Sequence, residues 1–318
     1  MPPQEAPAAS RSSIDRRGLA AAIGAYAMWG LFPLYWYQLK TVPAVQTVAH
    51  RVVWCAVFVL GWVALRHERG WLRRALAAPR VLPLLAASSA LISLNWGIYI
   101  WAVTHGRVLD TSLGYFINPL ANVLVGVLLL RERLRATQWA AVGLGALGVL
   151  WLTFRHGELP WVALALAATF CLYGLIRKVV AVGAIPGLAI ENLILLLPAL
   201  VWLGWSDLRG EGVFGHGGGP PELLLIVGGA LTAVPLIGFA YGARRLSYSL
   251  VGLLLYVSPT LQLACGLLLG EAFTQDKMIG FACIWLGLAV YAVDGWRGSR
   301  NRAPLATAAR RDPGDNRA

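Results

Sequence analysis

The sequence has few charged residues. Only 13% of its 318 residues are Asp, Glu, Lys or Arg, whereas soluble globular domains carry about a quarter. Hydrophobic residues make up 58% of the chain, and the mean hydropathy is +0.64. Because so little charge cannot cover an aqueous surface, the composition predicts an integral membrane protein.

Motifs for catalysis and for metal or nucleotide binding are also missing. The four cysteines (Cys55, Cys171, Cys265 and Cys283) stand in apolar runs without metal-ligand spacing, so they indicate neither a disulfide framework nor a zinc site. The sequence contains no Ser/His/Asp set, no HExxH segment and no phosphate-binding loop. We therefore predict no enzyme activity, no catalytic residue, no bound metal and no cofactor.

Apolar segments long enough to cross a membrane are abundant. A spanning helix needs about 20 mostly apolar residues. Ten such segments are present: 18–38, 45–65, 81–103, 110–130, 137–154, 159–179, 186–206, 221–241, 249–270 and 277–296. The flanking segments 1–17 and 297–318 are rich in Ala, Pro, Ser and Arg without apolar periodicity, which predicts disordered tails.

Basic residues outnumber acidic ones by 27 to 15, and they lie mostly on one side of the predicted membrane. With the N-terminus inside, 21 of them fall on the inner side, five fall on the outer side, and Arg51 lies within a span. An excess of Lys and Arg marks the cytoplasmic side. This distribution predicts that both termini are cytoplasmic, and it explains the net charge of +12 without a nucleic-acid partner.

Two stretches in different halves of the chain are alike, one beginning SLGYFINPLANVL at Ser112 and the other SLVGLLLYVSPTLQL at Ser249. The matched residues are Pro119 with Pro259, Asn122 with Gln262, Gly126 with Gly266 and, after a one-residue gap, Glu132 with Glu271. Each half, 18–154 and 159–296, then holds five spans. Because five is odd, the halves enter the membrane in opposite orientations. The predicted fold class is all-α, with ten transmembrane helices in two inverted five-helix repeats.

Several segments resemble a known family. The spacing from Pro119 to Glu132, the segment GEAFT at 270–274, and the segments AHRVVW, LNWGIYIWAV, SLGYFINPL, LYGLIRK and DKMIGFACIW are similar to those of the EamA family of the drug/metabolite transporter superfamily. The likeness covers about residues 18–296. One departure is Arg131, which stands where the family usually has Gly. The resemblance implies a bacterial inner-membrane transporter, usually an exporter, with a central cavity between its halves.

Arg51 is a fixed charge inside a span, where it costs about 2.5–3.5 kcal/mol at the centre of a helix. We expect it to lie in an outer polar layer. Three roles are open: an anchor for a substrate anion or carboxylate, a structural pair with a neighbour such as Asn95 or Asn118, and snorkelling toward the outer surface.

A second polar layer is expected near the inner side, because the second half runs in the opposite direction. The predicted solute-binding residues of both layers are Trp29, His50, Arg51, Asn95, Tyr99, Tyr115, Asn118, Asn122, Tyr173, Thr232, Ser258 and Gln262. Hydrogen bonding between helices is the alternative role for the amides and hydroxyls. Interfacial belts are the alternative for the aromatic residues.

Glu191 is the acidic residue well inside a span. Because burial disfavours a charged carboxylate, Glu191 is the first candidate for proton coupling, and His50 is the second. The alternative for Glu191 is a pair with Arg177 or Lys178 near the inner surface.

The expected function is secondary transport that exports small amphipathic metabolites or drugs by alternating access. The expected partners are a small-molecule solute, protons and the lipid bilayer. The alternative is a non-transporting membrane sensor or scaffold subunit, which would need a soluble output surface that the short loops do not offer. The segment GLGALG at 143–148 indicates close helix packing, and such a face would also suit a homodimer.

Overall fold

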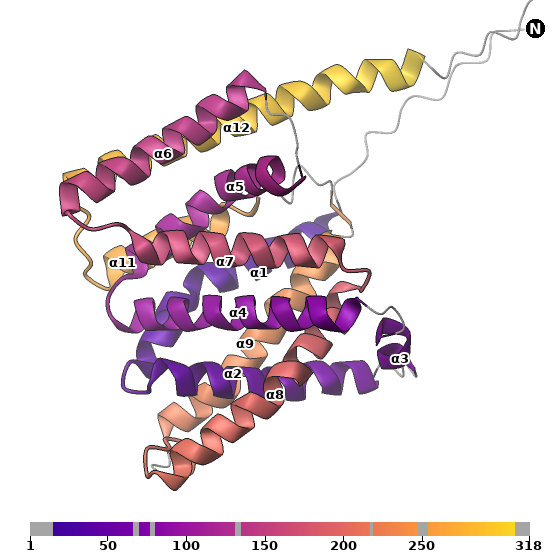
Figure 1. Ribbon diagram of the computed structural model, residues 1–318, viewed down its shortest axis with the longest axis vertical. Coiled ribbons are helices and arrows are strands. Elements are labelled where there is room, and N and C mark those ends of the chain that lie inside the picture. The colour runs from indigo at the N-terminus through magenta and orange to yellow at the C-terminus, as the bar shows by residue number, and fades with distance from the viewer. Residues whose placement is uncertain are drawn as a thin grey trace, which may run out of the picture.

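The computed structural model describes residues 15–65, 70–76, 80–130, 135–216, 219–243, 245–246 and 254–308. This part of the chain is all-helical, with eleven α-helices and one 3-10 helix. Eight of its helices are long and apolar enough to span a membrane, and Trp161–Arg177 and Val257–Leu268 are shorter apolar helices. The protein is therefore a multi-pass membrane protein built as a helical bundle (Figure 1).

Each of the ten predicted spans overlaps a helix, and eight of these helices are of membrane-spanning length. The first half contains α1 (Arg16–Trp36), the 3-10 helix η1 (Tyr37–Leu39), α2 (Ala44–Leu65), α3 (Trp71–Leu76), α4 (Val81–Thr104), α5 (Val108–Leu130) and α6 (Ala136–His156). The second half contains α7 (Trp161–Val179), α8 (Ala184–Leu208), α9 (Pro220–Ala243), α11 (Val257–Leu268) and α12 (Gln275–Ala308).

Three features of the helices differ from the sequence-based expectation. The short helix α3 occupies part of the loop that was expected at 66–80. The described part of the ninth span is helix α11, which begins at Val257, while the expected start at 249 lies outside the described residues. Helix α12 continues to Ala308, past the expected end at 296. The predicted disorder from 297 is therefore wrong as far as 308, while 1–14, 309–318, Arg131 and Glu132 lie outside the described residues.

The helices of the two halves pack on one another. Helices α6 and α12 lie side by side along one edge of the bundle (Figure 1). Elsewhere α1 packs on α9 and α11, α2 packs on α8 and α9, α4 packs on α7 and α8, and α5 packs on α7 and α11. Because all of these contacts join one half to the other, the halves interlock, and each buried hydrophobic cluster contains residues of both halves.

One end of the bundle, called the Glu271 end below, is closed by bonds between the halves. The Glu271 carboxylate accepts hydrogen bonds from the backbone N–H of Leu109 (2.9 Å) and of Val108. These N–H groups belong to the first turn of α5, where backbone N–H groups have no acceptor within their own helix. Burial raises the pKa of the Glu271 carboxyl, although both N–H groups favour its charged form. Nearby, Gln46 Nε2 donates to the Glu211 carbonyl oxygen at 2.7 Å.

The opposite end, called the Asp15 end, is joined by ion pairs. The Asp15 carboxylate lies 3.4 Å from Arg245 Nε, and the Asp294 carboxylate lies 3.2 Å from Arg135 Nη1. Each pair again links a first-half residue to a second-half residue. Because these side chains are partly exposed, each pair contributes at most about 1 kcal/mol.

Glycines allow several helices to approach closely. A Cβ atom on Gly145 would lie 2.4 Å from Leu120 Cδ1, and one on Gly148 would lie 2.7 Å from the Gly280 carbonyl oxygen. The close packing predicted for 143–148 is confirmed at these two positions. The tightest contact of this kind between α9 and α2 is at Gly229, where a Cβ would lie 2.3 Å from Trp54 Cβ.

Replacing Gly229 by Ala is expected to lower the free energy of unfolding by about 1–3 kcal/mol, because the added methyl group forces α9 away from α2. The thermal unfolding midpoint of the purified protein in detergent measures this effect. Gly143→Ala is the matched control, since its Cβ would meet no described atom within 4 Å and Ala favours the helix. Equal midpoints for the two variants would contradict the close contact.

Candidate solute-binding site

Arg51 is held inside the bundle. It lies on α2, seven residues after Ala44 at the Glu271 end, which corresponds to a depth of about 10 Å. Its side chain is 5% exposed, and its Nε donates a hydrogen bond to Thr232 Oγ1 on α9 at 2.8 Å. The Thr232 hydroxyl in turn donates to the Gly228 carbonyl oxygen at 2.9 Å. The guanidinium is thus anchored by a helix of the opposite half and does not extend toward the bundle end.

Aromatic rings surround the Arg51 guanidinium. Its central carbon lies 4.1 Å from the ring centroid of Trp96, 5.2 Å from that of Trp36 and 5.8 Å from that of Phe32. These distances are typical of cation–π contacts, which stabilise a desolvated cation by about 2 kcal/mol. Among the described residues, no carboxylate lies within 4.0 Å of Arg51. Aromatic faces and one hydroxyl therefore hold a positive charge that has no counter-ion in this part of the chain.

Glu191 forms a second charged centre. It is 1% exposed and lies on α8, seven residues after Ala184. Ser88 Oγ donates to Glu191 Oε1 at 2.6 Å, and the Tyr173 hydroxyl donates to Oε2 at 3.4 Å. Arg177 Nη1 lies 3.7 Å from Oε1. The structure therefore contains the Arg177 pair that the sequence left open, within a site that also includes two hydroxyl donors.

The two charged centres are arranged alike. Arg51 is on α2, the second predicted span of its half, and bonds to a hydroxyl on α9, the third predicted span of the other half. Glu191 is likewise on α8, the second predicted span of its half, and bonds to a hydroxyl on α4, the third predicted span of the first half. Each charge lies seven residues into its helix. The bundle thus holds opposite charges at corresponding positions in its two halves.

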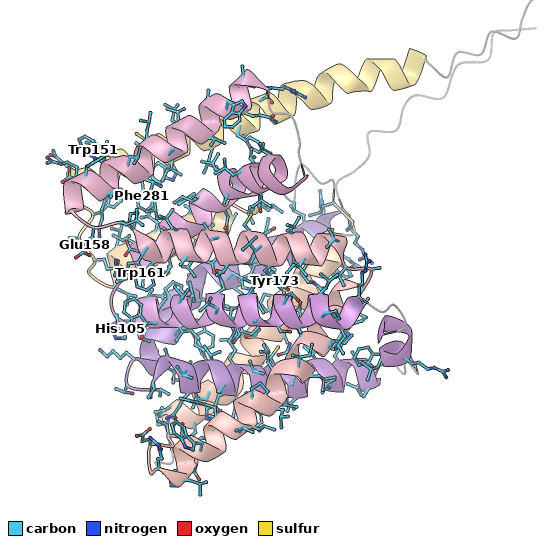
Figure 2. All side chains as sticks on the ribbon, viewed as in Figure 1. His105, Trp151, Glu158, Trp161, Tyr173 and Phe281 are labelled. Atoms are coloured by element: carbon cyan, nitrogen blue, oxygen red, sulfur yellow. The ribbon has the colours of Figure 1, made fainter. Side chains whose placement is uncertain are left out.

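A row of aromatic rings leads from one centre to the other. The ring centroids of Tyr99 and Tyr115 are 6.0 Å apart, those of Tyr115 and Phe170 are 6.1 Å apart, and those of Phe170 and Tyr173 are 6.0 Å apart. Tyr99 begins the row in the core cluster that contains Trp36. Tyr173 ends it beside the Glu191 carboxylate and lies within the bundle in Figure 2.

The predicted asparagines have different surroundings. Asn95 Nδ2 donates to the Leu166 carbonyl oxygen at 3.1 Å and to Thr169 Oγ1 at 2.9 Å, so it joins α4 to α7 and is not the partner of Arg51. Asn118 is buried, and its Oδ1 has no hydrogen-bond partner among the described residues. Asn122 is exposed, so the structure does not bring it to either charged centre.

The remaining predicted residues contact neighbouring helices or the connections between helices. Gln262 Nε2 donates to Ser258 Oγ at 3.3 Å and to the Trp29 carbonyl oxygen at 3.4 Å, which joins α11 to α1. The His50 ring packs 5.0 Å from the Phe214 ring in the connection between α8 and α9. The structure thus brings Arg51, Thr232 and Tyr99 to one centre and Glu191 and Tyr173 to the other.

Sequence reasoning did not assign the residues Phe32, Trp36 and Ser88. The spacing of Phe32 and Trp36, one helical turn apart on α1, was a usable signal, because it places two aromatic rings on one helix face. Ser88 gave no such signal. Within the described residues no group of three or more His, Cys, Asp or Glu side chains could hold a metal ion.

Two apolar grooves lie elsewhere on the bundle, with volumes of about 660 and 630 Å³. The first lies between α5, α6 and α7, and the second lies along α2 and α4. None of the predicted site residues lines either groove. The side chains at the Arg51 centre are thus packed together and buried from solvent in this structure.

Comparison with known proteins gives matches along most of the chain. Residues 16–154 match the EamA-like transporter family. An uncharacterised transporter of Pseudomonas aeruginosa is 46% identical over 286 residues, which cover 90% of this chain and 96% of that protein. The protein RarD of Streptomyces exfoliatus is 44% identical over 298 residues, which cover 93% of this chain and 94% of that protein. A solved crystal structure has a TM-score of 0.57 over 86% of this chain and 96% of its own, and at 20% identity it shows a likeness of fold alone.

Proposed function

Because this chain belongs to the EamA-like transporter family, we propose that it is a RarD-type secondary transporter of the bacterial inner membrane. It exports small amphipathic metabolites or drugs by alternating access, and both of its termini lie in the cytoplasm. The observation that carries the proposal is the pair of buried charges, Arg51 and Glu191, at corresponding positions in the two halves.

The packing of the helices supports two inverted repeats. The contact of α1 with α9 and α11 has its counterpart in the contact of α7 with α4 and α5. The contact of α2 with α9 likewise corresponds to that of α8 with α4. A bundle whose halves are related in this way can rock one half against the other around a central site.

The depths of the two charges support a path between them. Each charge lies about 10 Å from a different end of the bundle, and the aromatic row connects them. A charged side chain in a membrane interior is costly and commonly marks a substrate or proton pathway. In this structure the Arg51 centre is closed to solvent. Alternating access requires such a closed state between the states that are open to either side of the membrane.

Export can be measured in cells that lack the gene and are supplied with the wild-type chain. A panel of metabolites and antibiotics is loaded, and accumulation is compared with cells that carry an empty vector. We expect lower accumulation of at least one amphipathic compound, and less export after a protonophore collapses the proton gradient. Equal accumulation of every compound would contradict transport and favour a sensor or scaffold. Export that persists unchanged without the proton gradient would contradict proton coupling but not transport.

A further inference from the structure

Among the described residues, Trp36 and Tyr99 each bury a polar group that has no hydrogen-bond partner. Their side chains are 1% and 3% exposed. Neither the Trp36 indole Nε1 nor the Tyr99 hydroxyl has a partner within the part of the chain that the structure describes. Leaving a buried donor unpaired is costly, so such groups are rare and need an explanation. A ligand that accepts hydrogen bonds would provide one.

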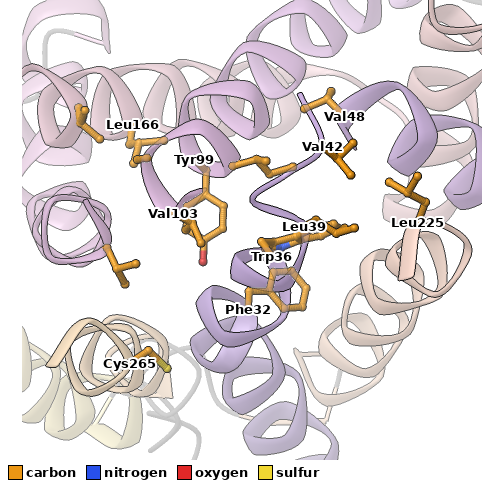
Figure 3. Packing of buried hydrophobic residues seen from close by; sticks show 14 residues of the cluster. Phe32, Trp36, Leu39, Val42, Val48, Tyr99, Val103, Leu166, Leu225 and Cys265 are labelled. Atoms are coloured by element: carbon orange, nitrogen blue, oxygen red, sulfur yellow. The ribbon is translucent and has the colours of Figure 1, made fainter. Parts of the chain in front are cut away.

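Both residues that carry the unpaired groups lie near Arg51. The guanidinium lies 5.2 Å from the Trp36 ring centroid, and Tyr99 is close enough to interact electrostatically with it. Trp36, Tyr99 and Phe32 belong to one packed cluster, shown in Figure 3. In that view the Tyr99 hydroxyl is directed toward the region between Phe32 and Cys265. Three hydrogen-bond donors, one of them charged, are therefore gathered in one buried region.

We propose that Arg51, Trp36 and Tyr99 bind the carboxylate group of an organic monoanion. The inference rests on the proposed transport function and names the charge class of its solute. Arg51 uses Nε for Thr232, so its terminal nitrogens are the groups that face a carboxylate. The indole N–H is a donor only, and the Tyr99 hydroxyl can donate as well. The aromatic rings that surround Arg51 then contact the apolar body of the anion.

The composition of the site disfavours other solutes. A cation would meet the Arg51 charge without a carboxylate to offset it among the described neighbours. A neutral solute would leave the guanidinium without a counter-charge in a buried environment, where charges are costly. An anion removes both problems, because it neutralises Arg51 and accepts hydrogen bonds from all three donors.

Binding can be measured on the purified full-length protein in nanodiscs by ligand-induced shifts of the thermal unfolding midpoint. The probes are benzoate and phenylacetate, with benzamide as the neutral analogue, benzylamine as the cation and phosphate as an inorganic anion. We expect stabilisation by the two carboxylates only. Arg51→Met is expected to weaken benzoate binding by at least about tenfold, since hydrogen bonds to charged groups are worth about 1.5–3 kcal/mol.

Tyr99→Phe removes only the hydroxyl and keeps the ring, so it tests the site if Arg51→Met does not fold. We expect it to weaken benzoate binding by about three- to tenfold. Arg209→Met is the matched control, because Arg209 stacks on Trp205 at 3.9 Å outside the buried site. Equal stabilisation by benzamide, stabilisation by phosphate in place of the carboxylates, or no stabilisation by any probe would overturn the inference. Export without a preference for carboxylates would contradict the carboxylate site but not the transport function. Carboxylate binding without export would contradict the transport function but not the carboxylate site.

Discussion

Replacing Arg51 by Met is expected to reduce export of a transported compound by about 10- to 100-fold. Met fills a similar volume and can pack against Trp36 and Trp96, but it carries no charge and cannot bind a negatively charged group of the solute. The magnitude corresponds to the loss of charge-assisted hydrogen bonds worth about 1.5–3 kcal/mol. Initial rates of export in cells or proteoliposomes, normalised to the amount of folded protein, measure the effect.

The stability of the same variant separates a functional from a structural role. Arg51 has one hydrogen bond to Thr232 and no described counter-ion, so removing its charge also removes a desolvation cost. We therefore expect the unfolding midpoint of Arg51→Met to equal or exceed that of the wild type. A large fall in the midpoint together with normal export by the folded fraction would show that Arg51 only holds the helices together. Arg209→Met again serves as the control for loss of a stacked arginine.

Replacing Glu191 by Gln is expected to abolish the dependence of export on the proton gradient. Gln keeps the shape of the side chain and can still accept a hydrogen bond from Ser88, but it cannot bind and release a proton. We expect a protonophore to have no effect on export by this variant. Wild-type export is expected to fall by at least about tenfold, because a proton gradient of one pH unit corresponds to a tenfold change in the equilibrium. Export at matched internal and external pH provides the comparison.

The neighbours of Glu191 define the control for that experiment. Tyr173 and Arg177 contact the same carboxylate, so a variant of either would alter the centre itself. Glu158→Gln is suitable, because Glu158 is exposed in the connection between α6 and α7, at the bundle end away from Tyr173 (Figure 2). Export by Glu191→Gln that responds to the protonophore as the wild type does would contradict a coupling role. The proton would then have to bind elsewhere or not at all.

The candidate site was only partly predictable. Arg51 and Glu191 were evident, because a charge within an apolar run is rare enough to stand out in the sequence. Arg177 was expected as a partner of Glu191 and lies beside it, but the partner of Arg51 was not evident. Asn95 was an expected neighbour of Arg51, yet it bonds to α7, while the actual hydrogen-bond partner Thr232 is 181 residues away in the chain. A single hydroxyl in a hydrophobic helix has no feature in the sequence that tells which helix it will face.

Membership of the EamA-like family and the location of the helices, to within a few residues at most boundaries, could be predicted from the sequence. Both follow from local composition, since runs of about 20 apolar residues form helices in a bilayer wherever they occur. Which polar groups meet, including the Trp36 and Tyr99 donors near Arg51, became apparent from the three-dimensional packing. In lipid both the outer and the inner face of a helix are apolar, so hydrophobicity does not reveal how each helix is rotated. That rotation is set by close packing at small residues such as Gly229, and it places the charges.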